Sequence, residues 1–241
     1  MRSFDYIESG KTLLTPHTTS LLAAIHEAKG RQSIQTTIRP DILGTLVAVA
    51  RIQSTDASNR IEGISTSDSR LNDLVSEKVT PRNRNEEEIA GYRDALSVIH
   101  ESHDYIPITP NVILQLHRDL FRHTPLTFAG HFKDSDNVII ERDAHGTSTV
   151  RFAPPSALVT PELIERACSA YTQAIRDGHT DPLLAIAMFI LDFTCIHPFN
   201  DGNGRMSRLL TLLMLCRNGY MVGKYISIEP VSYTHLTLPT T

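Results

Sequence analysis

Residues Ile196–Arg208 read IHPFNDGNGRMSR, and this short stretch places a histidine, a carboxylate, two glycines and two arginines close together. Apolar runs precede it at Leu183–Ile196 and follow it at Leu209–Cys216. Both runs are typical of buried helices. The polar residues between them are therefore predicted to form a loop that a rigid helical scaffold holds in place.

The glycines of this loop favour the binding of an anion. Gly202 and Gly204 permit positive φ and close approach of the backbone, so consecutive N–H groups can converge on a negative charge. Helical periodicity resumes at Met206, and the amino end of a helix also attracts negative charge. The loop is therefore predicted to bind the phosphates of a nucleotide.

The charged side chains around the glycines suit phosphate chemistry. Arg205 and Arg208 are three residues apart, so we expect them to share one helix face and to reach phosphates through forked hydrogen bonds. Asp201 is a candidate ligand for Mg²⁺. His197 ends the preceding helix, and its imidazole is suited to take a proton from an attacking hydroxyl.

The segment His197–Arg208 matches the signature His-Pro-Phe-x-Asp/Glu-Gly-Asn-Gly-Arg-x-x-Arg of Fic-domain proteins at every specified position. The chain thus resembles that family. The resemblance implies a mainly α-helical fold, in which a helical bundle core carries a β-hairpin flap and an N-terminal helical extension. It also implies transfer of AMP from ATP to a Ser, Thr or Tyr hydroxyl of a target protein.

The same resemblance implies a role for each residue of the loop. His197 would be the general base, and Asp201 would help to coordinate Mg²⁺. Asn203, with the backbone around Gly202 and Gly204, would hold the α and β phosphates of ATP. Arg205 would contact the β phosphate and Arg208 the γ phosphate.

A second stretch, Ser58–Gly63 (SNRIEG), fits the Ser/Thr-x-x-x-Glu-Gly/Asn inhibitory motif of many members of this family. Its place before the core resembles the class with an N-terminal inhibitory helix, which implies that Ser58 and Glu62 are inhibitory and that Glu62 pairs with Arg208. An arginine held by a carboxylate cannot hold the γ phosphate, so the α phosphorus would be misaligned for attack. Taken alone, Glu followed by Gly is typical of an exposed helix end.

Two short β-prone runs, Asn137–Ile140 and Thr149–Phe152, are separated by Gly146 and polar residues. They predict a hairpin. The resemblance implies that the hairpin is a flap over the active site, where Val138, Ile139 and Ile140 would align a target segment by adding a strand. An ordinary surface hairpin is the alternative.

Amphipathic helical patterns dominate the rest of the chain. We divide it into an N-terminal helical region (1–107), a catalytic core (108–230) and a tail (231–241) that resembles translated sequencing-adaptor sequence. His117–Leu120 (HRDL) is interpreted as helix surface, because it lacks the other parts of a kinase catalytic loop. The expected helices are Thr19–Ala28, Asp41–Gln53, a short inhibitory helix Ala57–Glu62, Asp68–Glu77, Glu86–His100, Asn111–Phe121, Pro161–Asp177, Pro182–Ile196 and Gly204–Arg217.

Composition favours a cytoplasmic enzyme. The net charge of the 241-residue chain is −4 and its basic residues form no long stripe, so nucleic acid is a poor candidate partner. The longest apolar run contains Asp192 and is too short for a bilayer, and the first residues lack a secretory pattern. We therefore expect no membrane association.

Several functions remain open from the sequence. The same fold could transfer UMP, phosphocholine or phosphate, or could remove AMP from a modified protein with Glu62 positioning a water. A non-catalytic interaction module that binds nucleotide is a further alternative. The expected partner is a target protein with a hydroxyl side chain, with self-modification and a homodimer as further alternatives.

Overall fold

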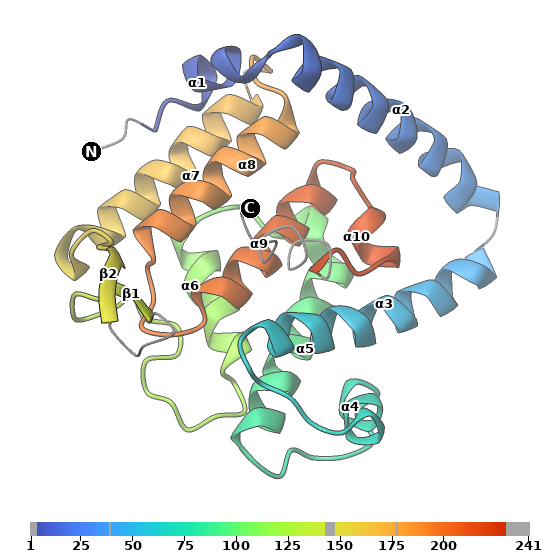
Figure 1. The fold of residues 1–241 in the computed structure, drawn as a ribbon. Helices are drawn as coiled ribbons and strands as arrows, with labels where there is room; N and C mark the ends of the chain where they lie inside the picture. Colours follow the sequence, from blue (N-terminus) through green and yellow to red (C-terminus); the bar gives the residue numbers. More distant parts are fainter. Residues whose placement is uncertain (1–3, 39, 143–147, 177, 230–241) are drawn as a thin grey trace.

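The computed structural model describes residues 4–38, 40–142, 148–176 and 178–229. These residues form an α-helical body with one projecting β-hairpin, which confirms the predicted fold class (Figure 1). The predicted tail 231–241 lies outside the described residues. The elements are α1 Tyr6–Leu13, α2 Pro16–Ile38, α3 Pro40–Ile61, α4 Asp68–Val75, α5 Arg84–Ser102, α6 Pro110–Leu120, β1 Ile139–Arg142, β2 Ser148–Phe152, α7 Thr160–Arg176, α8 Pro182–Ile196, α9 Asn203–Arg217 and α10 Val222–Tyr225.

Helix α9 lies in the middle of the body and packs against α8, α5, α3 and α10 (Figure 1). Its buried side chains include Met206, Leu209, Leu213 and Met214. A helix that is apolar on most sides is stable only when other elements surround it. The main apolar cluster also draws on α1, α5, α6, α7 and α8, so it includes residues from both sides of the domain boundary predicted at residue 107.

Helix α8 begins and ends where the sequence predicts. The side chain of Asp181 accepts a hydrogen bond from the Leu183 N–H, and Pro182 occupies the first helical position, a pattern that favours a helix start. His197 ends the helix in the left-handed conformation, with φ 51° and ψ 63°. Pro198 follows, and a proline restricts the residue before it to non-helical geometry.

Helix α3 differs from the prediction, because one continuous helix of 22 residues replaces the two expected segments Asp41–Gln53 and Ala57–Glu62. The polar residues Ser54, Thr55 and Ser58 are at most 2% exposed, since this part of α3 packs against the rest of the body. Tertiary packing thus sustains helix where local propensity favours a break. Helix α2 is likewise longer than predicted, and the short helices α1 and α10 were not predicted.

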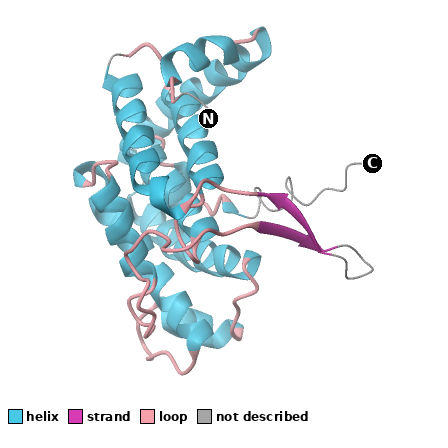
Figure 2. Cartoon of the chain, turned by 90° about the vertical axis from the view of Figure 1, so that its left-hand side faces the viewer, coloured by secondary structure: helices cyan, strands magenta, loops and turns pink. Residues whose placement is uncertain are grey.

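The hairpin β1–β2 projects from the helical body (Figure 2). Its strands are antiparallel, and Ile140 pairs with Val150. Both side chains are more than half exposed, at 53% and 62%. The structure therefore confirms the predicted hairpin, although Val138 precedes the first strand and Gly146 lies outside the described residues.

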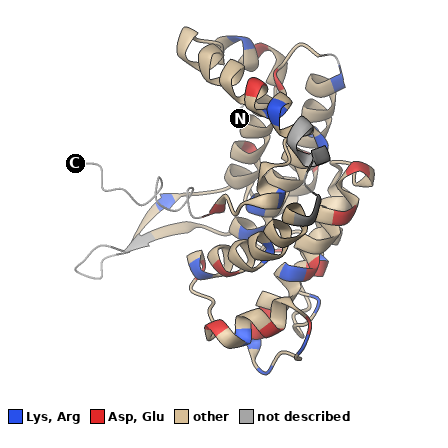
Figure 3. Ribbon diagram, turned by 90° about the vertical axis from the view of Figure 1, so that its right-hand side faces the viewer, with Lys and Arg blue, Asp and Glu red and all other residues tan. Residues whose placement is uncertain are grey.

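Acidic and basic residues are interspersed along the helices (Figure 3). Within the described ranges, no helix combines the length and the apolar character that crossing a membrane would require.

Candidate functional site

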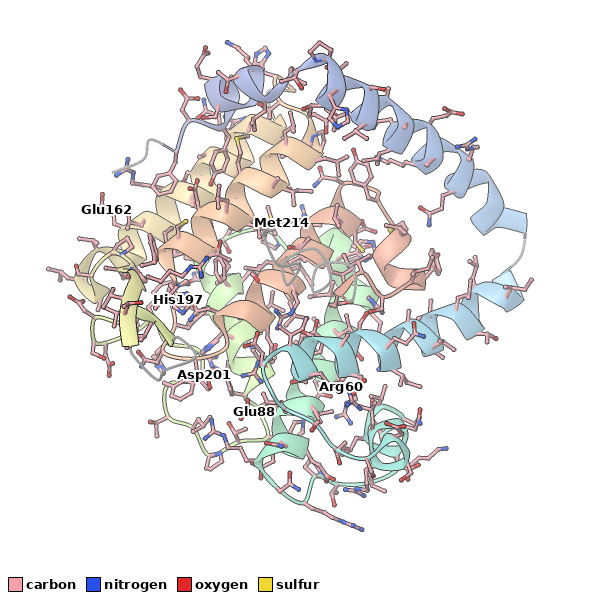
Figure 4. The ribbon with its side chains drawn as sticks, viewed as in Figure 1. Arg60, Glu88, Glu162, His197, Asp201 and Met214 are labelled. Carbon is pink, nitrogen blue, oxygen red and sulfur yellow. The ribbon has the colours of Figure 1, made fainter. Side chains whose placement is uncertain are left out.

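The loop between α8 and α9 carries His197 at its start and Asp201 near its end (Figure 4). Gly202 closes the loop with φ 80° and precedes the first residue of α9. A β-carbon at Gly202 would lie 2.9 Å from the ring of Phe121, so both the backbone conformation and the available space require glycine here. The loop is therefore fixed against α6 and opens directly onto the amino end of α9.

Asn203 holds the shape of this loop from inside. Its side-chain oxygen accepts the Phe199 N–H at 2.9 Å, and its side-chain nitrogen donates to the Phe199 carbonyl at 2.8 Å. The residue is 5% exposed. This differs from the expectation that the Asn203 side chain contacts phosphates, because both ends of its amide already bind the backbone. The backbone N–H groups at the start of α9 remain suited to an anion.

His117 and Lys133 hold the loop from outside. The imidazole of His117 is fully buried and stacks on Phe199 with a centroid distance of 3.7 Å. Its Nδ1 accepts the Gly130 N–H at 2.9 Å, so its Nε2 donates to the Asp201 carbonyl at 3.1 Å. Burial lowers the pKa of His117 to about 4. A neutral imidazole of this tautomer thus joins α6 to the loop.

The interpretation of His117 as helix surface was wrong. Ile113, Leu116, His117 and Leu120 are all buried, at the spacing of a single apolar helix face. The position of the histidine within that stripe was the signal that sequence reasoning missed. The backbone N–H of Lys133 donates to the Pro198 carbonyl at 2.8 Å, and its Nζ donates to the Ile196 carbonyl at 3.2 Å.

His197 is partly buried at the end of α8. Burial is the main cause that lowers its pKa from the usual 6.5, and the nearby charge of Lys133 lowers it further, while Thr194 and Glu62 act in the opposite sense. The imidazole is therefore neutral at neutral pH. A neutral imidazole can accept a proton, which is what a general base requires.

Arg208, on α9, contacts both predicted inhibitory residues. Its Nη2 lies 2.7 Å from Oε1 of Glu62. Its Nε donates to the Ser58 hydroxyl at 2.7 Å, and its Nη2 also donates to the Ser58 carbonyl at 3.0 Å. The structure thus brings Arg208 together with Ser58 and Glu62, which precede it by 150 and 146 positions in the chain.

The Glu62 carboxylate also lies over the amino end of α9. A β-carbon built on Gly204 would overlap Oε1 of Glu62. The carboxylate is therefore a negative group placed against the glycine turn and the second arginine. Backbone N–H groups and a positive side chain at a helix start are also the features that bind a phosphate.

Arg205 does not share the open face of Arg208, as the spacing predicted. It is 1% exposed and its Nη1 lies 2.6 Å from Oε2 of Glu88, on α5. Its guanidinium also lies 5.0 Å from the ring centre of Phe121. A buried ion pair is costly to break, so Arg205 ties α9 to α5 in this conformation instead of facing a ligand.

Asp201 is the carboxylate of the loop that is open to solvent, with a side chain 45% exposed. Its Oδ1 accepts the Gly202 N–H at 2.6 Å. Over the described residues, no group of three or more His, Cys, Asp or Glu side chains could hold a metal ion. One accessible carboxylate fits Mg²⁺ that is bound together with substrate phosphates, because this ion commonly uses one or two protein carboxylates.

The base of the hairpin contacts the same loop. The side-chain nitrogen of Asn137 donates to the Phe199 carbonyl at 3.4 Å, and Lys133 donates to the Asn137 oxygen at 3.0 Å. An apolar cavity of about 540 Å³ lies between the end of β2 and α8, lined in part by Phe152 and Ile196. The hairpin segment Val138, Ile139 and Ile140 thus directly follows a residue, Asn137, that is anchored to the loop after His197.

The sequence profile of the Fic/DOC family matches residues 107–215 of this chain. A Fido domain-containing protein of Dictyostelium discoideum is 35% identical over 103 residues, which cover 41% of this chain and 67% of that protein. The chain belongs to the Fic/DOC family. The matched region contains the whole loop from His197 and most of α9.

Two further matches extend the likeness of this Fic-family chain. The protein adenylyltransferase fic-1 of Caenorhabditis elegans is 28% identical over 145 residues, 57% of this chain and 25% of that protein. A Fic family protein of Desulfovibrio desulfuricans has a similar structure, with a TM-score of 0.73, 24% identity, and coverage of 92% of this chain and 64% of that one. This structural likeness establishes the shared fold. The chain spans only a quarter of the length of the nematode relative.

Proposed function

We propose that this Fic-family chain is a protein adenylyltransferase that transfers AMP from ATP to a hydroxyl side chain of a target protein, and that Glu62 restrains it. The observation that carries the proposal is the position of the Glu62 carboxylate against Gly204 and Arg208, beside a neutral His197. The name of the nematode relative supports the choice of AMP transfer.

In the proposed reaction, Nε2 or Nδ1 of His197 accepts the proton of the target hydroxyl. The hydroxyl oxygen forms a bond with the α phosphorus of ATP, and the bond from that phosphorus to the bridging oxygen of the β phosphate breaks. Pyrophosphate then leaves. The backbone N–H groups at the start of α9 orient the phosphates, and Arg208 binds the γ phosphate once it is released from Glu62.

Asp201 would hold Mg²⁺ against the phosphates, and the ion would offset their negative charge. Arg205 contributes indirectly, because its ion pair with Glu88 at 2.6 Å fixes the start of α9 to α5. His117 and Lys133 keep the loop in place, so that His197 stays near the reacting oxygen. The hairpin, anchored to the loop through Asn137 and Phe199, would bind the target segment.

Inhibition would follow from competition between two anions. Glu62 occupies the guanidinium of Arg208 that the γ phosphate needs. The side chains of Arg208 and Glu62 are 16% and 36% exposed, so the ion pair is partly buried. Displacement of α3 would remove Glu62 from Arg208 and end the restraint.

The test is labelling by ATP with a radioactive α phosphate, with and without Glu62→Gly. We expect the variant to label itself or a lysate protein at least about tenfold more strongly, because correct orientation of a reactant changes reaction rates by such factors. The exposed Glu101 on α5 supplies the matched control, since Glu101→Gly should label like the wild type. Equal labelling by Glu62→Gly and wild type would refute the inhibitory role.

The same assay tests the chemistry. Adding His197→Ala to Glu62→Gly should reduce labelling by about 10²- to 10⁴-fold, the usual contribution of a general base. Retained labelling would remove His197 from the mechanism. Parallel reactions with UTP, GTP and CTP test which nucleotide the protein uses. If one of them labels more strongly than ATP, its nucleoside monophosphate, and not AMP, is the transferred group.

A further inference from the structure

Glu229, in the segment that follows α10, is a buried carboxyl group held by hydroxyls. It is 3% exposed. Its Oε2 accepts hydrogen bonds from Ser54 at 3.0 Å and from Ser227 at 2.8 Å, and its Oε1 accepts one from Tyr92 at 3.4 Å. Among the described residues, no salt-bridge partner lies within reach of it. A buried acidic group needs such donors, because leaving one unpaired is costly.

One of these donors belongs to the helix that carries the inhibitory residues. Ser54 lies on α3, four residues before Ser58 and eight before Glu62. Residues at four-residue steps share one face of a helix. The same stripe of α3 therefore contacts Glu229 at Ser54 and Arg208 at Ser58.

The buried side of α3 depends on such hydrogen bonds, because it offers little apolar surface. From residue 42 onward, its buried side chains are Ala50, Ser54, Thr55, Ser58 and Asn59. Of these, Thr55 Oγ1 and Asn59 Oδ1 have no hydrogen-bond partner. Buried polar groups without a hydrogen-bond partner disfavour the packing of α3 against the helical body. The satisfied ones, Ser54 with Glu229 and Ser58 with Arg208, therefore help to hold the helix, together with the hydrogen bond from Arg51 to Ser97 and the packing of Ile52 against a second apolar cluster.

Tyr92, on α5, lies between the two contacts just described, Ser54 with Glu229 and Ser58 with Arg208. It is fully buried, and burial is the main cause that raises the pKa of its hydroxyl. The hydroxyl donates to Glu229 at 3.4 Å, and the nearby Ser58 and Arg208 act to lower the pKa of the same hydroxyl. Glu229 is thus joined to the inhibitory face of α3 directly through Ser54 and indirectly through Tyr92.

We propose that Glu229 is a positioning residue of the inhibited state, which holds α3 through Ser54 and thereby keeps Glu62 on Arg208. This inference rests on the proposed function and adds a residue to its regulation. It predicts that loosening the contact between Ser54 and Glu229 releases α3 and raises AMP transfer, although neither residue touches the reacting atoms.

The first experiment measures hydrogen–deuterium exchange of α3 in the full chain. Ser54→Ala removes the hydroxyl that links Glu229 to α3, whereas the matched control Ser227→Ala removes a hydroxyl from the same carboxyl oxygen without touching α3. We expect Ser54→Ala and Glu229→Gln to accelerate exchange in α3 about three- to tenfold, the effect of losing one net hydrogen bond. Ser227→Ala should stay within about twofold of the wild type. Equal exchange of α3 in Ser54→Ala and wild type would overturn the proposal.

The second experiment repeats AMP labelling in two backgrounds. In the wild type, Ser54→Ala should raise labelling about three- to tenfold. In Glu62→Gly it should have no further effect, because the inhibitory carboxylate is already gone. An equal decrease in both backgrounds would mean that Ser54 supports the fold or the chemistry, and the proposed positioning role would be wrong.

The two readouts separate the two proposals. If Glu62→Gly does not raise labelling, inhibition by Glu62 fails, while the exchange of α3 still decides whether Glu229 holds the helix. If Glu62→Gly raises labelling and Ser54→Ala changes neither exchange nor labelling, only the role of Glu229 fails. Tyr92→Phe provides a second variant, and Tyr171→Phe, which removes another buried tyrosine hydroxyl, is its control.

Discussion

Helices α8 and α3 both present residues to the site, but they are held by different forces. The buried face of α8 is built from large apolar side chains, among them Phe189, Phe193 and Ile196. The buried face of α3 is built from Ala50 and small polar side chains such as Ser54 and Ser58. Burial of apolar area stabilises α8 whatever the details of geometry, whereas α3 depends on a few directed contacts. We therefore expect the helix that carries His197 to be held more firmly than the helix that carries Glu62.

The largest change in stability is expected when a large side chain on the apolar face of α8 is truncated. Phe193 is fully buried, so Phe193→Ala should lower the free energy of unfolding by about 3–5 kcal/mol. Urea denaturation measures this change. A loss of unfolding free energy below about 1 kcal/mol would show that the core around α8 tolerates cavities. The contrast between a firmly held α8 and a less firmly held α3 would then be wrong.

A smaller effect is expected where the loop is tied to α6. His117→Phe keeps an aromatic ring over Phe199 but leaves the Gly130 N–H and the Asp201 carbonyl without their partner. We expect a loss of about 1–3 kcal/mol in unfolding free energy and weaker labelling in the Glu62→Gly background. The exposed His179 is the control site. Equal unfolding free energies for His179→Phe and His117→Phe would show that the hydrogen bonds of His117 do not stabilise the loop.

A gain in stability, instead of a loss, is expected from a substitution on α3. Thr55 Oγ1 is buried without a partner, and Thr55→Val replaces its hydroxyl with a methyl group of similar size. Relief of an unsatisfied group should stabilise the docked helix by about 1 kcal/mol. Slower exchange of α3 amides and weaker labelling by the otherwise unchanged protein would follow. Destabilisation would argue that Thr55 has a partner in solution.

The smallest effect concerns the pH dependence of transfer. Burial lowers the pKa of His197 below its usual 6.5. A base is active above its pKa, so transfer by Glu62→Gly should persist through pH 6.5 and fall only at lower pH. Loss of Glu62 acts in the same direction, since its charge raises the pKa. A pH–rate profile whose acidic limb lies above 6.5 would contradict this assignment.

The sequence anticipated much of the fold for local reasons. Asp181-Pro182 at the start of α8 and His197-Pro198 at its end determine the helix through capping and through the limits that proline sets. The hairpin was also anticipated, because β-prone runs alternate with turn residues. For α3, in contrast, its polar residues 54–59 suggested a break, and burial by neighbouring helices made the helix continuous.

For the candidate site, the sequence by itself determined the glycine turn at the start of α9, the place of His197 beside it and, through a known motif, the meeting of Glu62 with Arg208. Only the tertiary structure decided that Arg205 turns inward to Glu88, that the Asn203 amide binds its own loop, and that His117 and Glu229 support the site from other elements. The physical reason is that spacing along a helix tells which residues share a face. It does not tell which face the rest of the molecule will cover.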